Sequence, residues 1–146
     1  VAGLGLDGHA YILEDASLQA SPEVWAQTVL SAADEWEGDR IVAETNFGGD
    51  MVKTILKQAI TETGSEVRIK LVRASRGKAV RAEPIVARYE RGHVHHVGGL
   101  PHLEHELVNW LPDSGMPSPN RLDALVWALT DLLLKDQHRE AGSHQG

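Results

Sequence analysis

The sequence of 146 residues lacks cysteine, has few aromatic residues and contains no long apolar run. Without cysteine there are no disulfide bonds and no thiolate metal ligands, which fits an intracellular protein. The longest apolar region, 122–134, is interrupted by Asp123, Thr130 and Asp131, so it does not predict a membrane span. We also find no signal-peptide pattern and no glycine-rich phosphate-binding loop. What remains is an ordinary soluble composition, 42% hydrophobic and 24% charged, in a chain long enough for one domain.

Positive charge is scarce overall, because the formal net charge is −7. This argues against a general nucleic-acid coat protein, but a DNA enzyme needs only a local basic patch and its catalytic carboxylates add negative charge. Such a patch lies in the middle of the chain. Its members are Arg68, Lys70, Arg73, Arg76, Lys78, Arg81, Arg88 and Arg91.

The hydrophobic periodicity predicts a β-hairpin followed by alternating helices and strands. The hairpin turns at Asp7-Gly8, and Ser21-Pro22 begins a helix. We expect strands at 1–6, 9–13, 41–44, 67–71 and 93–97, and helices at 22–37, 50–63, 74–91, 101–110 and 119–135, with Pro84 kinking or splitting one helix and Ser118-Pro119 capping the last. This order predicts an α/β domain over residues 1–135, with a mixed sheet flanked by helices and an edge strand at 93–97. Residues 136–146 are expected to be a disordered tail.

The most informative stretch, 41–52, reads as a buried strand, a glycine pair and the start of a helix. Glu44 falls at the carboxyl end of the strand, where open α/β sheets place their chemistry. A carboxylate there needs a cation or solvent. From this stretch alone a hard metal ion, a nearby arginine and a solvated side chain all remain open.

A second acid, Asp123, lies in the first turns of a helix that is apolar nearly all round. It could simply favour the helix dipole, but its apolar neighbours predict that it is partly buried. Two carboxylates brought close together repel unless a cation or proton lies between them. Asp131, two turns later, is expected to be peripheral.

Three motifs occur in order: IVAETNFGGDMV (41–52), ASRGKAVRAEPIVARYERGHVHHVG (74–98) and SPNRLDALVWALTDLLL (118–134), preceded by the hairpin GLGLDGHAYILEDAS (3–17). Together they resemble the carboxy-terminal nuclease domain of the large terminase subunit, the DNA-packaging motor of tailed phages and prophages. The resemblance implies a ribonuclease H-like fold. It also implies metal-dependent endonuclease cleavage of concatemeric double-stranded DNA during genome packaging.

In the family that this chain resembles, three carboxylates hold two divalent ions, Mg²⁺ or Mn²⁺. The strand-end acid of the family matches Glu44 and its late helical aspartate matches Asp123. The family's first acid belongs on a central strand just before the hairpin. Since Val1 already lies in the hairpin and no initiator Met is present, we expect a fragment that lacks this strand and acid. We therefore expect weak metal binding and low or absent cleavage from this fragment.

Further residues have candidate roles in binding. Lys78 and Arg81 are one helical turn apart and, with Arg76, could grip DNA phosphates, although a solvated basic face is an equal alternative. Asn120 could hydrogen-bond a metal-bound water, but a plain helix-start residue is the simpler interpretation. A zinc site can be drawn from histidines that are more simply surface residues: His93, His95, His96, His102 and His105. The tryptophans, at positions 25, 36, 110 and 127, are expected in the core.

The resemblance also implies partners: double-stranded DNA, an upstream ATPase domain of the same subunit, the portal and the small terminase subunit, in the host cell cytoplasm and without a membrane. Two other functions remain open. One is another ribonuclease H-like nuclease of the resolvase type. The other is a catalytically incomplete module that binds DNA or a packaging partner.

Overall fold

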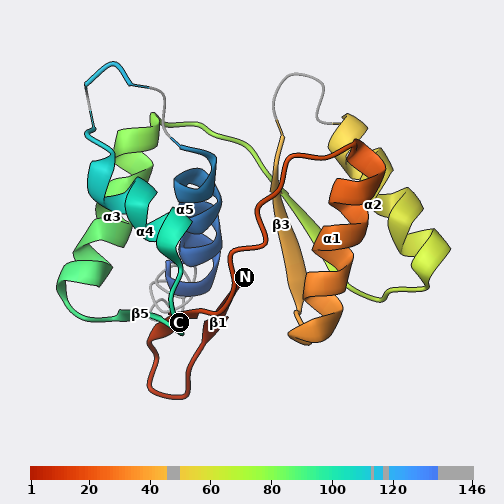
Figure 1. The fold of residues 1–146 in the computed structure, drawn as a ribbon, viewed down its shortest axis with the longest axis horizontal. Helices are drawn as coiled ribbons and strands as arrows, with labels where there is room; N and C mark the ends of the chain where they lie inside the picture. Colours follow the sequence, from red (N-terminus) through yellow and green to blue (C-terminus); the bar gives the residue numbers. More distant parts are fainter. Residues whose placement is uncertain (46–49, 113, 117–118, 135–146) are drawn as a thin grey trace, which may run out of the picture. The chain divides into compact units, whose positions relative to one another are not determined.

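The computed structural model describes residues 1–45, 50–112, 114–116 and 119–134 (Figure 1). The chain divides into two compact units. Residues 16–75, with Val1, form the first unit; residues 2–15 and the chain from Arg76 onward form the second. Within the described residues, none of the helices has the length and apolar character needed to cross a bilayer.

The first unit contains two helices and a two-stranded parallel sheet: α1 (Pro22–Glu35), β3 (Arg40–Glu44), α2 (Asp50–Thr63) and β4 (Arg68–Val72). As predicted, Ser21 caps α1, and its hydroxyl accepts a hydrogen bond from the Val24 amide at 3.5 Å. The sheet pairs β3 with β4 in register from Arg40 opposite Arg68 to Glu44 opposite Val72. The amide of Thr45 donates to the Val72 carbonyl at 2.9 Å, which extends the pairing by one residue.

Both helices of the first unit pack on one side of this sheet. Leu30 of α1 and Leu56 of α2 are fully buried in a cluster with Ala43 of β3. Because successive strand residues point to opposite faces, Ala43 faces the helices and Glu44 points to the other face. The packing of α1 and α2 therefore decides the direction of the Glu44 side chain.

The second unit contains a three-stranded mixed sheet and three helices: β1 (Ala2–Leu4), β2 (Ala10–Ile12), α3 (Lys78–Glu90), β5 (Val94–His96), α4 (Pro101–Asn109) and α5 (Asn120–Leu133). The strand order is β1-β2-β5, with β1 antiparallel and β5 parallel to β2. The predicted hairpin and edge strand are confirmed. Gly8 allows the hairpin turn because its φ of +79° is in the left-handed region.

The core of the second unit lies between its sheet and its helices. Ala10 and Ile12 of β2 are buried against residues of α5 such as Leu129, which is fully buried. Ala82 and Ile85 bring α3 into the same cluster, and buried leucines bring in α4. This core fixes α3 and α5 to each other and to the sheet.

The predicted mixed sheet flanked by helices is found in the second unit, but it does not include all five strands. β3 and β4 instead hydrogen-bond to each other in a separate parallel sheet. An alternation of strands and helices predicts the class of the fold, but it does not determine which strands pair, because pairing depends on contacts distant in sequence. The predicted missing strand before the hairpin stays a prediction.

Two predicted helix starts differ in the structure. α3 begins at Lys78, with Gly77 as its N-cap, and Pro84 does not split it, while a kink at Pro84 stays a prediction. Proline inside a helix costs about 3 kcal/mol, and here the buried contacts of Ala82 and Ile85 oppose that cost. The N-cap of α5 is Pro119, without a side-chain cap from that residue. Ser118, the glycine pair at 48–49 and the predicted tail at 136–146 lie outside the described residues.

Candidate functional site

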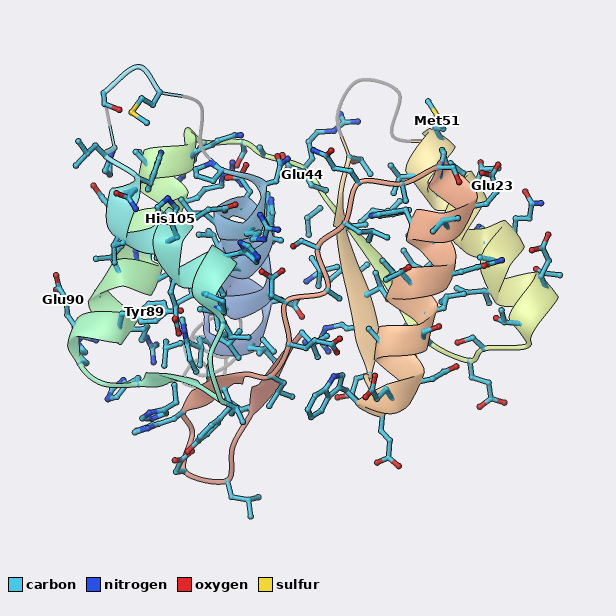
Figure 2. The ribbon with its side chains drawn as sticks, in the orientation of Figure 1. Glu23, Glu44, Met51, Tyr89, Glu90 and His105 are labelled. Atoms are coloured by element: carbon cyan, nitrogen blue, oxygen red, sulfur yellow. The ribbon has the colours of Figure 1, made fainter. Side chains whose placement is uncertain are left out.

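Glu44 is the last residue of β3, as the sequence predicted, and Figure 2 labels it at that end of the strand. Its side chain is half-buried. It points to the face of the sheet opposite α1 and α2 because Ala43, its neighbour, packs against them. The carboxylate is thus held on a rigid strand rather than on a loop.

Asp123 lies in the first turn of α5, and its carboxylate is 18% exposed. The prediction that it is partly buried is confirmed. Its Oδ2 atom accepts a hydrogen bond from the Lys78 ammonium at 2.7 Å, a charge-assisted contact between α5 and α3. The carboxylate therefore has a cation beside it within the protein itself.

The predicted basic face of α3 lies along α5. One turn after Lys78, the guanidinium of Arg81 sits over the Trp127 ring, 4.7 Å from the centroid. Arg81 Nε is buried and has no hydrogen-bond acceptor within the part of the chain that the structure describes. Lys78 and Arg81 thus share a face, as expected, while their contact with phosphate stays a prediction. Arg76 is exposed two residues before α3.

Asn120 and Asp131 are the other polar residues of α5 for which the sequence suggested a place relative to the site. Asn120 is exposed at the first helical position, which confirms a helix-start residue and leaves its role toward a metal-bound water untested. Asp131 is buried, only 7% exposed, and its expected place outside the site stays a prediction. Asp131 follows Trp127 by one turn on the same face of α5, and this covered face extends along the helix. Trp127 contacts Arg81 as part of that face.

A network of charged side chains fixes the start of α5. Arg121 donates from Nε to Asp15 Oδ2 at 2.9 Å and from Nη1 to Glu106 Oε1 at 3.0 Å. The other oxygen of Glu106 accepts the Leu122 amide at 3.1 Å, in the helical turn that carries Asp123. Glu106 therefore replaces the side-chain cap that Pro119 cannot supply. This network was not predicted from the sequence, because its members are distant from one another along the chain.

The histidines contact one another and the helices instead of assembling around a metal position. His9 Nδ1 is 2.7 Å from His95 Nε2, and the two rings stack. His96 lies between Tyr89 and Glu104, with contacts of 2.7 Å and 3.1 Å. His102 and His105 are exposed on α4. In the described ranges, no group of three or more metal-ligating side chains could hold an ion, which counts against the zinc alternative.

The tryptophan prediction is only partly right. Trp25 and Trp110 pack against the two cores. Trp36 is 39% exposed, because it lies at the C-cap of α1 rather than within the helical stripe.

The raised pKa of Tyr89 predicts that the folded state loses stability at high pH. Burial, and secondly the Glu104 charge, raises the pKa of Tyr89 (labelled in Figure 2) above its usual value. The phenol ionises near pH ~10 in the unfolded chain but not in the folded one, so its contribution is complete below pH ~10 and is lost above it. Because Tyr89 is partly exposed, we expect a loss of up to about 1 kcal/mol per pH unit.

Urea unfolding of the wild type and of Tyr89→Phe, between about pH 9 and pH 11, measures this loss. The free energy of unfolding of the variant should fall less steeply. Tyr11→Phe is the comparison: its hydrogen bond to Asp7 also raises the pKa of Tyr11, but on the exposed hairpin, so this variant should change the slope less than Tyr89→Phe does. If the free energy of unfolding fell equally steeply with pH for the wild type and for Tyr89→Phe, ionisation of Tyr89 would not be the cause of the loss.

Comparison with known proteins gives one family. The sequence profile of a family described as "Terminase RNaseH-like domain" matches residues 5–132. The match includes both units, with Glu44 and Asp123 inside it. No curated protein sequence matches the chain.

Proposed function

Because the chain belongs to the terminase RNaseH-like domain family, we propose that it is the metal-dependent endonuclease domain of a viral large terminase. Its substrate would be concatemeric double-stranded DNA, cleaved during genome packaging. The observation that carries this proposal is the family match over residues 5–132. The family itself gives a terminase domain of the nuclease type. Metal dependence, the DNA substrate and the roles of individual residues are proposed.

In this proposal Glu44 and Asp123 are metal ligands. Carboxylate oxygens suit hard cations, and the Asp123 carboxylate already contacts a cation, the Lys78 ammonium at 2.7 Å. Two divalent ions, Mg²⁺ or Mn²⁺, would activate the attacking water and stabilise the leaving 3′ oxygen. Among the residues that the structure describes, no group of three metal-ligating side chains is found. On the family resemblance alone, we propose that the family's first acid, on a strand upstream of the hairpin, completes the site.

The basic residues would position the DNA backbone. Arg81 is held against the Trp127 ring, which fixes the guanidinium with little loss of entropy when it binds a phosphate. Arg76 and Lys78 precede it by about one turn and add positive charge at the start of α3, where helix amides also favour anions. Asn120 would hydrogen-bond a water at Asp123.

The proposed setting is the packaging motor. An ATPase domain of the same subunit would lie upstream, and the portal and the small terminase subunit would be partners in the host cytoplasm. These partners rest on the family alone.

Plasmid cleavage tests the proposed function. The chain extended by its natural upstream residues should nick and linearise plasmid with Mn²⁺, and the 146-residue chain should do so weakly or not at all. Cleavage that persists in a chelator would overturn metal dependence. If the extended chain binds plasmid tightly yet leaves it intact with Mn²⁺ and with Mg²⁺, the binding-module alternative replaces the nuclease.

A further inference from the structure

We propose that Lys78 holds the cation position at Asp123 when metal is absent, and that a divalent ion displaces it. The displaced ammonium then binds a DNA phosphate beside the metal. This inference rests on the proposed function, because it takes Asp123 as a metal ligand. Lys78 would be a positioning residue that couples metal binding to DNA binding.

The contact between Lys78 and Asp123 has the form of an occupied cation site. The ammonium lies 2.7 Å from Oδ2, and the carboxylate is 18% exposed. A carboxylate withdrawn from water to this extent is costly without a positive partner. Lys78 supplies that partner from a different helix. A divalent ion with carboxylate ligands carries twice the charge, so it can take the place of the ammonium.

Lys78 is also able to leave. Its side chain is 48% exposed, and a lysine side chain is a flexible stem with a strongly hydrated head. It occupies the first position of α3, after the N-cap Gly77, and it is not among the buried residues of that helix. The lysine can therefore change rotamer without disturbing the core.

Arg81 shows where the displaced ammonium would act. It lies one turn further along the same face of α3 and is fixed by its stacking on Trp127. Without metal, Arg81 would face the backbone of DNA while Lys78 stays bound to Asp123. With metal, both cations would face phosphates. Metal and DNA would then strengthen each other's binding, and the coupling would be reciprocal.

Direct measurement of Mn²⁺ binding tests the displacement. The extended chain is titrated with Mn²⁺, and free ion is followed by its electron paramagnetic resonance signal. Lys78→Met keeps the length of the stem and removes the charge. It should bind Mn²⁺ about fivefold more tightly, as expected for the loss of a competing, partly exposed ion pair.

Two variants separate the possible explanations. Arg91→Met removes one positive charge at the exposed far end of the same helix and should leave Mn²⁺ affinity within about twofold, by screening over that distance. Asp123→Asn should abolish the measured site. If Lys78→Met binds no more tightly than Arg91→Met, the displacement is overturned while the proposed function stands. If Asp123→Asn binds as the wild type does, the metal site of the proposed function is itself wrong.

The binding of a short DNA duplex gives a second readout. Fluorescence anisotropy is measured against salt concentration, with Ca²⁺ as a non-cleaving ion and without it. In Ca²⁺, Lys78→Met should show a salt slope lower than that of the wild type by about 0.9, the value for one phosphate contact. Without metal, the two slopes should agree. If the salt slope of Lys78→Met were lower than that of the wild type by the same amount with and without Ca²⁺, Lys78 would bind phosphate whether or not metal is present. That result would overturn the inference.

Discussion

Replacing Asp123 by asparagine in the extended chain is expected to lower the rate of Mn²⁺-dependent plasmid cleavage about 1000-fold. Loss of a ligand that holds the metal removes several kcal/mol of transition-state stabilisation, and about 4 kcal/mol corresponds to this factor. Glu44→Gln should lose a similar amount. Asparagine and glutamine have nearly the shape of the acids that they replace, so the loss of cleavage rate reflects the charge of the carboxylate.

The control for this experiment is Glu90→Gln. Glu90, labelled in Figure 2, is exposed at the end of α3 opposite to Lys78, and its replacement should leave cleavage within about twofold. Circular dichroism checks that each variant is folded, since Asp123→Asn also removes the charge opposite Lys78. Cleavage that survives Asp123→Asn or Glu44→Gln in a folded protein would remove that residue from the site.

Replacing Glu106 by alanine is expected to lower the free energy of unfolding by about 3 kcal/mol. Glu106 satisfies the Leu122 amide and contacts Arg121, and its carboxylate is 17% exposed. A lost helix cap costs about 1 kcal/mol, and a lost hydrogen bond to a charged group costs about 2 kcal/mol. Urea unfolding gives the total. Hydrogen exchange of the Leu122 amide should become faster, because the first turn of α5 loses its acceptor.

Glu104→Ala on the same helix is the matched control. Glu104 is 46% exposed and contacts His96, so its removal should cost less than about 1 kcal/mol. Glu106→Gln keeps an acceptor for Leu122 and should fall between the two alanine variants. Equal losses for Glu104→Ala and Glu106→Ala would show that the Leu122 cap is not the stabilising feature.

The sequence was informative where the physical cause is local. Ser21 predicted the start of α1, Asp7-Gly8 predicted the hairpin, and the apolar run before a glycine pair placed Glu44 at the end of β3. The acidic position in the first turn of α5 and its apolar neighbours predicted that Asp123 is partly buried.

The errors and omissions concern contacts between distant residues. Pairing among the five strands depends on such contacts, and the sequence pattern could not divide them into two sheets. The contact of Lys78 with Asp123 spans 45 residues and that of Arg121 with Asp15 spans 106. The burial of Asp131 was not predicted, because it depends on the covered face of α5 that also carries Trp127.

The second unit is discontinuous in sequence, and this has a consequence for folding during synthesis. Its hairpin is made first, but α3 and α5, which complete its core, follow only after residues 16–75. The first unit is continuous apart from Val1 and can fold as soon as residues 16–75 leave the ribosome. The hairpin must wait with its apolar face exposed until β5 and α5 are translated. We therefore expect the slow step of folding to be closure of the long loop between β2 and α3, since pairing of distant segments is slow.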